Sequence, residues 1–263
     1  MSGQSPGALA GRHALITGAG RGIGASIARQ LAAHGAKLTL VGRTASTVEA
    51  MSAELAAAGA QVFCATADVS QRESLDAAFA AARGAHGTID ILVNNAGQAA
   101  SSPISKRDDK LWNDMLAVNL SGTYYGIQAA LPDMLKNNFG RIVNIASTAG
   151  MTGYAYVAAY CAAKHGVVGL TRAVAREVAT RNVTVNAVCP GYTDTDIVRE
   201  AATKISKVTG RTTDEAVQIM AKTNPQGRLV KPEEVANAVA WLCLPGSEAV
   251  TGQSIIIAGG ELM

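Results

Sequence analysis

Short β-rich runs alternate with longer Ala-rich stretches of helical period between about residues 13 and 190. This alternation is typical of a parallel sheet with helices on both faces. Several of the short runs are almost continuously apolar, as strands are when both of their faces are covered. We therefore expect an α/β fold, a doubly wound parallel sheet of about seven strands, at 13–17, 37–42, 61–66, 89–94, 141–146, 182–188 and 254–258.

Helices are expected between these strands, at 22–34, 44–58, 70–85, 108–137, 154–180 and 232–244. Gly35, Gly59 and Gly87 follow the first three, and glycine is favoured at the left-handed position that ends a helix. The stretch 108–137 contains Gly122 and Pro132, so it predicts either two helices or one kinked helix.

No linker-like segment divides the chain, so we expect one domain over residues 12–263 after a flexible N-terminus at 1–11. Residues 192–231 break the alternation because they form a longer, more polar segment with two possible short helices. An insertion after the carboxyl end of a strand is where a lid over a ligand lies. We therefore predict a substrate lid over about 192–231.

Composition supports a buried core and excludes several classes of function. With 48% apolar and 16% charged residues, the chain is not disordered as a whole. A net charge of +3 is too small for a surface that neutralises many nucleic-acid phosphates. No uncharged run is apolar enough over the roughly 18 residues of a membrane span. The four cysteines and four histidines lack disulfide or metal-ligand spacing, which predicts reduced thiols, no metal site and a cytoplasmic location.

A glycine-rich loop follows the first expected strand and leads into a helix. The loop from Gly18 to Gly24 reads GAGRGIG. Backbone amides at a helix N-terminus converge where a pyrophosphate can lie, and glycine lets the ligand approach the main chain. The alternative is a strand-to-helix turn that only needs small residues, since such loops are common.

Five motifs together resemble the short-chain dehydrogenase/reductase family. They are the loop from Thr17 to Gly24, the NNAG at 94–97, Ser147, the pair Tyr160 and Lys164, and the PG at 190–191. Their order and approximate spacing match the family over about residues 12–260. The resemblance implies a Rossmann-like seven-stranded sheet, a nicotinamide cofactor and usually a homotetramer, in which the stretches 108–137 and 154–180 pair across a twofold axis.

The choice of cofactor follows from charge at the end of the second strand. An acid there would bond the adenosine ribose 2′-hydroxyl and repel a 2′-phosphate. This strand instead ends in Gly42 and Arg43, and Arg43 can pair with a phosphate. Arg21 resembles the second basic position of family members that use NADPH. The sequence favours NADP(H) and leaves NAD(H) open, because Arg43 can also be a solvated residue that starts the next helix.

Further cofactor contacts come from the resemblance. The family places an acid on the adenine amino group and an apolar side chain beside the ring, and Asp68 and Val69 match these positions, although Asp68 can also cap the next helix. The full set of implied cofactor residues is Gly18, Arg21, Gly22, Ile23, Gly24, Arg43, Asp68, Val69, Asn95, Ala96, Gly97, Tyr160, Lys164, Pro190, Gly191 and Thr193.

Four residues are candidates for the chemistry. Tyr160 and Lys164 are four apart on one helical face, and a nearby ammonium moves the pKa of a tyrosine toward working pH. Lys164 should also bond the nicotinamide ribose. Ser147 ends a strand and can polarise the carbonyl or alcohol oxygen. Asn119 matches the family asparagine whose backbone carbonyl holds a water on a proton relay, although it can also be a helix-kink residue.

The predicted lid carries an excess of positive charge. Residues 196–231 hold seven basic and four acidic side chains, an excess of +3. This pattern suggests a phosphate-bearing substrate handle, such as coenzyme A or an acyl carrier. A solvated mobile face is the alternative.

The subgroup that the chain most resembles reduces β-keto groups of acyl or polyketide chains, on the strength of residues 121–123, 144–150 and 227–234. The leading hypothesis is an NADP(H)-dependent carbonyl reductase or secondary-alcohol dehydrogenase. Alternatives are an NAD-dependent 3-hydroxyacyl or secondary-alcohol dehydrogenase, and a non-catalytic cofactor-binding sensor or scaffold. One departure is Ala258 before two glycines, where many relatives carry Asp or Asn, which puts subunit-edge contacts in doubt.

Overall fold

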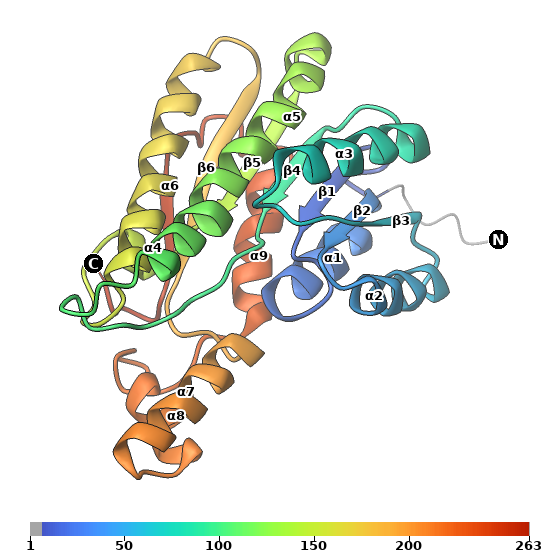
Figure 1. The fold of residues 1–263 in the computed structure, drawn as a ribbon. Helices are drawn as coiled ribbons and strands as arrows, with labels where there is room; N and C mark the ends of the chain where they lie inside the picture. Colours follow the sequence, from blue (N-terminus) through green and yellow to red (C-terminus); the bar gives the residue numbers. More distant parts are fainter. Residues whose placement is uncertain (1–6, 263) are drawn as a thin grey trace.

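The computed structural model describes residues 7–262 and has one seven-stranded sheet in the order β3-β2-β1-β4-β5-β6-β7 (Figure 1). Every neighbouring pair is parallel. The strands are β1 His13–Thr17, β2 Lys37–Gly42, β3 Val62–Thr66, β4 Ile91–Asn94, β5 Gly140–Ile145, β6 Val183–Pro190 and β7 Ser254–Ile257. The predicted doubly wound fold is confirmed, with strand ends shifted by one or two residues.

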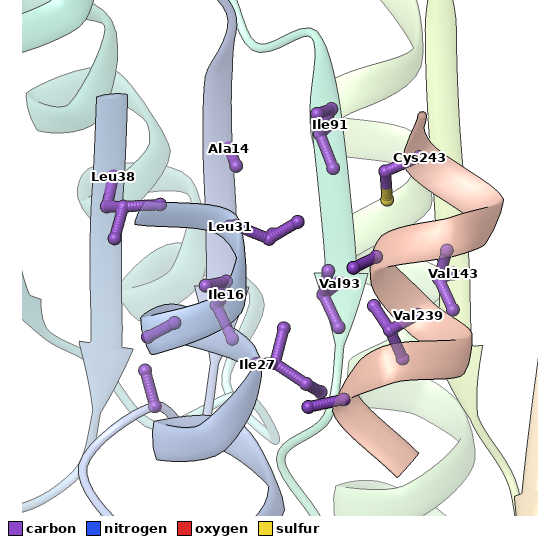
Figure 2. Close-up of a cluster of buried hydrophobic side chains, with 14 of the residues drawn as sticks. Ala14, Ile16, Ile27, Leu31, Leu38, Ile91, Val93, Val143, Val239 and Cys243 are labelled. Carbon is purple, nitrogen blue, oxygen red and sulfur yellow. The ribbon is translucent and has the colours of Figure 1, made fainter. Parts of the chain in front are cut away.

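Helices cover both faces of this sheet. One face packs against α1 Gly22–Ala33, α2 Ala45–Ala57 and α9 Pro232–Cys243, and the other against α3 Arg72–His86, α5 Gly122–Asn137 and α6 Ala158–Glu177. Figure 2 shows the first interface, where Ile27 and Leu31 of α1 and Val239 of α9 lie on the strands. The burial of these aliphatic side chains supplies the main driving force for the fold.

The glycines that the sequence assigns to helix ends have the expected conformation. Gly35, Gly59 and Gly87 have φ of 85°, 90° and 83°. Because a side chain disfavours this region, these positions end α1, α2 and α3.

The long helical stretch at 108–137 is interrupted, as Gly122 suggested. It consists of α4 Asp109–Leu116, one π-helical turn Ala117–Ser121 and then α5. Pro132 lies inside α5. The prediction of a helix from 154 needs correction, because α6 begins only at Ala158 and Tyr156, just before it, has a φ of 69°.

The predicted lid folds as two helices, α7 Asp196–Thr209 and α8 Thr213–Ala221, which stand apart from the sheet (Figure 1). They pack on each other through a small buried cluster of Val198, Ala202, Ala216 and Met220. A capping box of Thr212 and Glu215 begins α8. The predicted lid segment thus contains a compact hairpin of two helices.

The flexible N-terminus predicted for residues 1–11 falls partly outside the described residues, which begin at 7. From residue 7 the chain packs on the domain: Leu9 is buried, and its backbone N–H donates to the carbonyl of His34 at 2.9 Å. Within the described residues, no helix is long and apolar enough to cross a membrane.

Candidate active site

A cavity of about 280 Å³ lies at the carboxyl edge of the sheet. The strand order reverses between β1 and β4, and open α/β sheets bind ligands at such a switch point. Every site residue predicted from the sequence lines this cavity: Gly18, Arg21, Gly22, Ile23, Gly24, Arg43, Asp68, Val69, Asn95, Ala96, Gly97, Asn119, Ser147, Tyr160, Lys164, Pro190, Gly191 and Thr193. The structure therefore gathers residues that are up to 175 positions apart.

The glycine loop fits a pyrophosphate. The first turn of α1 contains no acid, and the residue before it, Arg21, makes no side-chain cap. The N–H groups of that turn are therefore available to an anion. Gly18 and Gly22 have φ of 64° and 54°, and a Cβ on Gly24 would stand 2.2 Å from the carbonyl oxygen of Gly18. The loop therefore needs glycine for its own packing.

Asn95 holds the glycine loop in place. Its Nδ2 donates to the carbonyl oxygens of Thr17 at 2.9 Å and Gly18 at 3.0 Å. In return, the Thr17 hydroxyl accepts from the backbone N–H groups of Asn95 and Ala96, both at 3.0 Å. The ends of β1 and β4 are thereby tied together beneath the cavity.

Arg43, Arg21 and Asp68 are charged residues that line the cavity. Arg43 is exposed at the end of β2, with no acid beside it on that strand. Burial raises the pKa of Asp68, but hydrogen bonds from the Ser70 hydroxyl and N–H, with the charge of Arg43, bring that pKa below its ordinary value. Asp68 thus accepts within the turn before α3 and lines the cavity. The alternative prediction that it caps the next helix is wrong, because the residue before the first turn of α3 is Gln71.

Arg21 reaches the lid. Its guanidinium lies 3.3 Å from Asp196 and 3.8 Å from Glu200, both on α7. All three side chains are more than half exposed, so these contacts contribute little to stability. The contact brings α7 over the glycine loop, where Thr195 also faces Gly22.

Ser147, Tyr160 and Lys164 lie close to one another in the same cavity. Ser147 follows β5 and begins a short turn, with its Oγ accepting from the N–H of Ala149 at 3.1 Å. Tyr160 is close enough to Ser147 for that residue to influence its pKa. The Nζ of Lys164 is 5.7 Å from the centre of the Tyr160 ring and donates to the carbonyl oxygen of Ile145 at 2.8 Å. An oxygen held by Ser147 would therefore lie beside the Tyr160 hydroxyl.

Burial dominates the acid–base balance of these groups. It raises the pKa of Tyr160 to about 12, although Ser147 opposes the shift, and it lowers the pKa of Lys164 to about 8. The four-residue spacing of Tyr160 and Lys164 predicts that the ammonium lowers the pKa of the tyrosine. In the structure the pKa of Tyr160 is shifted upward instead. Desolvation of the phenolate outweighs the charge of Lys164, because the Nζ of Lys164 is turned toward the carbonyl of Ile145.

Asn119 lies in the π-helical turn between α4 and α5. Its Nδ2 donates to the carbonyl oxygens of Gln98 and Met115, both at 3.0 Å, and its Oδ1 accepts from the N–H of Gln98 at 3.2 Å. The Asn119 carbonyl accepts from Thr123 at 3.0 Å. The side chain therefore clamps the loop after β4, and the residue also marks the kink, as the alternative interpretation held.

Sequence reasoning missed several cavity residues. Some directly follow residues that it identified, such as Thr44 after Arg43 and Gln98 after Gly97. Others come from the start of the lid, namely Thr195, Asp196, Ile197 and Val198. No local motif marks the lid residues, because only the position of α7 brings them to the cavity.

Comparisons with known proteins agree with this geometry. The family model of the short chain dehydrogenases matches residues 12–206. The 3-oxoacyl-[acyl-carrier-protein] reductase FabG of Escherichia coli is 37% identical over 253 residues, 96% of this chain and 98% of that protein. The enzyme of the same name from Vibrio cholerae is 38% identical over 255 residues, 97% of this chain and 99% of that protein.

A solved structure gives the same result. A crystal structure of a variant of actinorhodin polyketide ketoreductase with NADPH has a TM-score of 0.92 and 39% identity, covering 95% of this chain and 97% of that one. The chain belongs to the short-chain dehydrogenase family. It is an oxidoreductase of that family, related to the ketoacyl and polyketide ketoreductases.

Proposed function

We propose that the protein reduces the β-keto group of an acyl or polyketide chain, with NADPH as hydride donor. The observation that carries this proposal is that one cavity is lined both by Ser147, Tyr160 and Lys164 and by Arg43 and Arg21. The first set suits a carbonyl, and the second suits a 2′-phosphate.

The chain's own residues divide the chemistry. When bound, the nicotinamide supplies a hydride to the carbonyl carbon. Ser147 donates a hydrogen bond to the carbonyl oxygen, and Tyr160 gives that oxygen a proton as negative charge develops there. A raised pKa keeps Tyr160 protonated at neutral pH, which suits an acid in the direction of reduction. Lys164, with Gly97 and Asn119 nearby, would hold the ribose side of the cofactor.

Choice of NADPH over NADH rests on Arg43 and Arg21. Each can donate to a 2′-phosphate, and such charge-assisted bonds contribute about 1.5–3 kcal/mol. The test is a parallel titration of NADPH and NADH by protein-to-cofactor fluorescence transfer. Wild type should bind NADPH more tightly, and Arg43→Ala should remove most of the preference. Tighter NADH binding by wild type would instead support the NAD-dependent 3-hydroxyacyl or secondary-alcohol dehydrogenase.

The substrate class is tested by the rate of NADPH oxidation with a β-ketoacyl thioester and with a simple ketone of similar size. The proposal predicts a higher kcat/KM for the thioester. If only the simple ketone is turned over, the protein is a carbonyl reductase that acts on another class of substrate. A wild type that binds NADPH and oxidises it with neither compound would favour the sensor or scaffold.

The basic lid suggests that the acyl chain carries a phosphate handle, such as coenzyme A or a carrier. Arg199 pairs with Asp194 and Arg228 with Glu234, whereas Lys207 makes no ion pair among the described residues. Replacing Arg199 and Lys207 by Ala should raise the KM for a coenzyme A thioester and leave that of a short thioester without phosphate unchanged. If the variant and wild type have the same KM for the coenzyme A thioester, the phosphate handle is excluded.

We also propose a homotetramer, as the family resemblance implies. Trp112 of α4 and Tyr124 of α5 keep more than two-fifths of their surface exposed, which suits burial between subunits. Sedimentation at micromolar concentration should give four times the mass of the chain. A monomer would contradict this assembly.

A further inference from the structure

The last turn of the chain brings a carboxylate back to the active site. After β7 the backbone reverses at Gly259 and Gly260, whose φ values are 59° and 95°, and the N–H of Glu261 donates to Ala258 at 3.1 Å. A Cβ on Gly259 would stand 2.0 Å from Asn224, so glycine is required there. This turn directs Glu261 toward the loop that precedes α6.

Glu261 anchors a directed chain of hydrogen bonds. The Tyr154 hydroxyl donates to its Oε1, and the Tyr154 and Thr148 hydroxyls are 2.9 Å apart. Because a carboxylate only accepts, Tyr154 gives Glu261 its single proton and must accept from Thr148. The pKa of Tyr154 agrees: burial and the bond to Glu261 raise it, and the bond with Thr148 lowers it.

This chain ends beside the residue that holds the substrate oxygen. Thr148 is buried and directly follows Ser147, which begins the same short turn of residues 148–150. On its other side, Oε2 of Glu261 is buried with no hydrogen-bond partner among residues 7–262 and packs against Gly191, where a Cβ would stand 2.9 Å away. Glu261 is therefore linked to the turn of Ser147 through Tyr154, and it contacts the cavity wall directly at Gly191.

We propose that Glu261 is a positioning residue for Ser147, acting through Tyr154 and Thr148. A hydroxyl that must face both the substrate oxygen and Tyr160 tolerates little displacement, and a shift of about 1 Å can cost on the order of 10²-fold in rate. Losing the anchor frees the 148–150 turn, and Ser147 moves with it. The inference rests on the proposed carbonyl chemistry at Ser147.

The decisive experiment compares Glu261→Ala in two backgrounds. In the wild-type background we expect kcat to fall roughly tenfold. In the Ser147→Ala background, the residual rate is measured in single turnovers at excess enzyme. There, Glu261→Ala should lower the rate by less than about twofold, because the effects of residues that act as a unit do not add. Equal factors in both backgrounds, or an unchanged kcat, would overturn the proposal.

Three controls separate positioning from folding. Glu261→Gln keeps an oxygen that accepts from Tyr154 and should recover most of the rate, within about threefold of wild type. The NADPH dissociation constant, measured by fluorescence, should change by less than about twofold in Glu261→Ala. If Glu261→Ala does not fold by thermal melting, Tyr154→Phe takes its place, since it removes the hydroxyl and keeps the ring.

The assay uses any ketone or secondary alcohol that wild type converts. Failure of β-keto thioesters as substrates would therefore reject the proposed substrate class without affecting this test. Failure of the coupling between Glu261 and Ser147 would reject only the positioning role.

Discussion

Lys164 points its ammonium at the backbone of Ile145, and its Nζ stands 5.7 Å from the centre of the Tyr160 ring. A spacing of four residues on a helix places the two side chains on one face. The deep burial of Lys164, however, controls the pKa of its ammonium. A buried ammonium with one carbonyl partner loses its proton more readily than a solvated one.

The pH dependence of reduction should therefore report Lys164. Since its pKa is lowered to about 8 and that of Tyr160 is raised to about 12, kcat/KM should fall as pH rises through about 8, while Tyr160 stays protonated. The measurement is kcat/KM for ketone reduction from pH 6 to pH 10. Lys164→Arg keeps the positive charge and should show no decline in that range. A wild-type profile that is flat to pH 10 would contradict this assignment.

Gly24→Ala should impair both the fold and cofactor binding. Its Cβ would stand 2.2 Å from the carbonyl oxygen of Gly18, which is backbone and cannot yield without moving the loop. We expect a loss of about 1–3 kcal/mol in the free energy of unfolding and weaker NADPH binding. Gly84→Ala in α3 is the matched control, because nothing lies within 4 Å of its Cβ, and it should stabilise by about 0.5–1 kcal/mol. NADPH affinity unchanged in Gly24→Ala would speak against the phosphate loop.

Acid should destabilise the protein through His13. Its Nδ1 lies 3.0 Å from the carbonyl oxygen of Gly87 and so must donate, which leaves Nε2 to accept from Thr39 at 2.8 Å. Burial lowers the pKa of His13 below 6.5, and the same holds for the neighbouring His86. As pH falls below 6.5, the unfolded state therefore binds protons before the folded state does. The free energy of unfolding consequently decreases as pH falls below 6.5.

Chemical denaturation between pH 7.5 and pH 5 measures this effect. Each histidine can contribute a slope of at most about 1.4 kcal/mol per pH unit. His13→Gln keeps a donor and an acceptor but does not titrate, so its stability should depend less on pH than that of wild type. The same slope in both proteins would show that His13 is not responsible.

The sequence predicted the sheet and the cavity well because both depend on local signals. Neighbouring residues specify each buried strand, each helix that ends at glycine, and the loop from Gly18 to Gly24. The sheet topology then brings the carboxyl ends of the strands together. The π-helical turn before Gly122 was foreseen only as a break, since backbone geometry of that kind has no distinct composition.

What the sequence did not predict depends on contacts between distant residues. The contact of Tyr154 with Glu261 spans 107 positions and that of Arg21 with Asp196 spans 175. No periodicity or motif links such pairs. The pKa of Tyr160 was missed for a related reason, because the spacing to Lys164 is local but the burial that controls the titration is tertiary.

The most direct test of the account is a single-turnover measurement of NADPH oxidation by wild type and by Tyr160→Phe with the same ketone substrate. If Tyr160 is the acid, the variant should bind NADPH within about twofold of wild type and reduce the ketone about 10²- to 10⁴-fold more slowly. A Tyr160→Phe enzyme that turns over at the wild-type rate would contradict the assignment of this site.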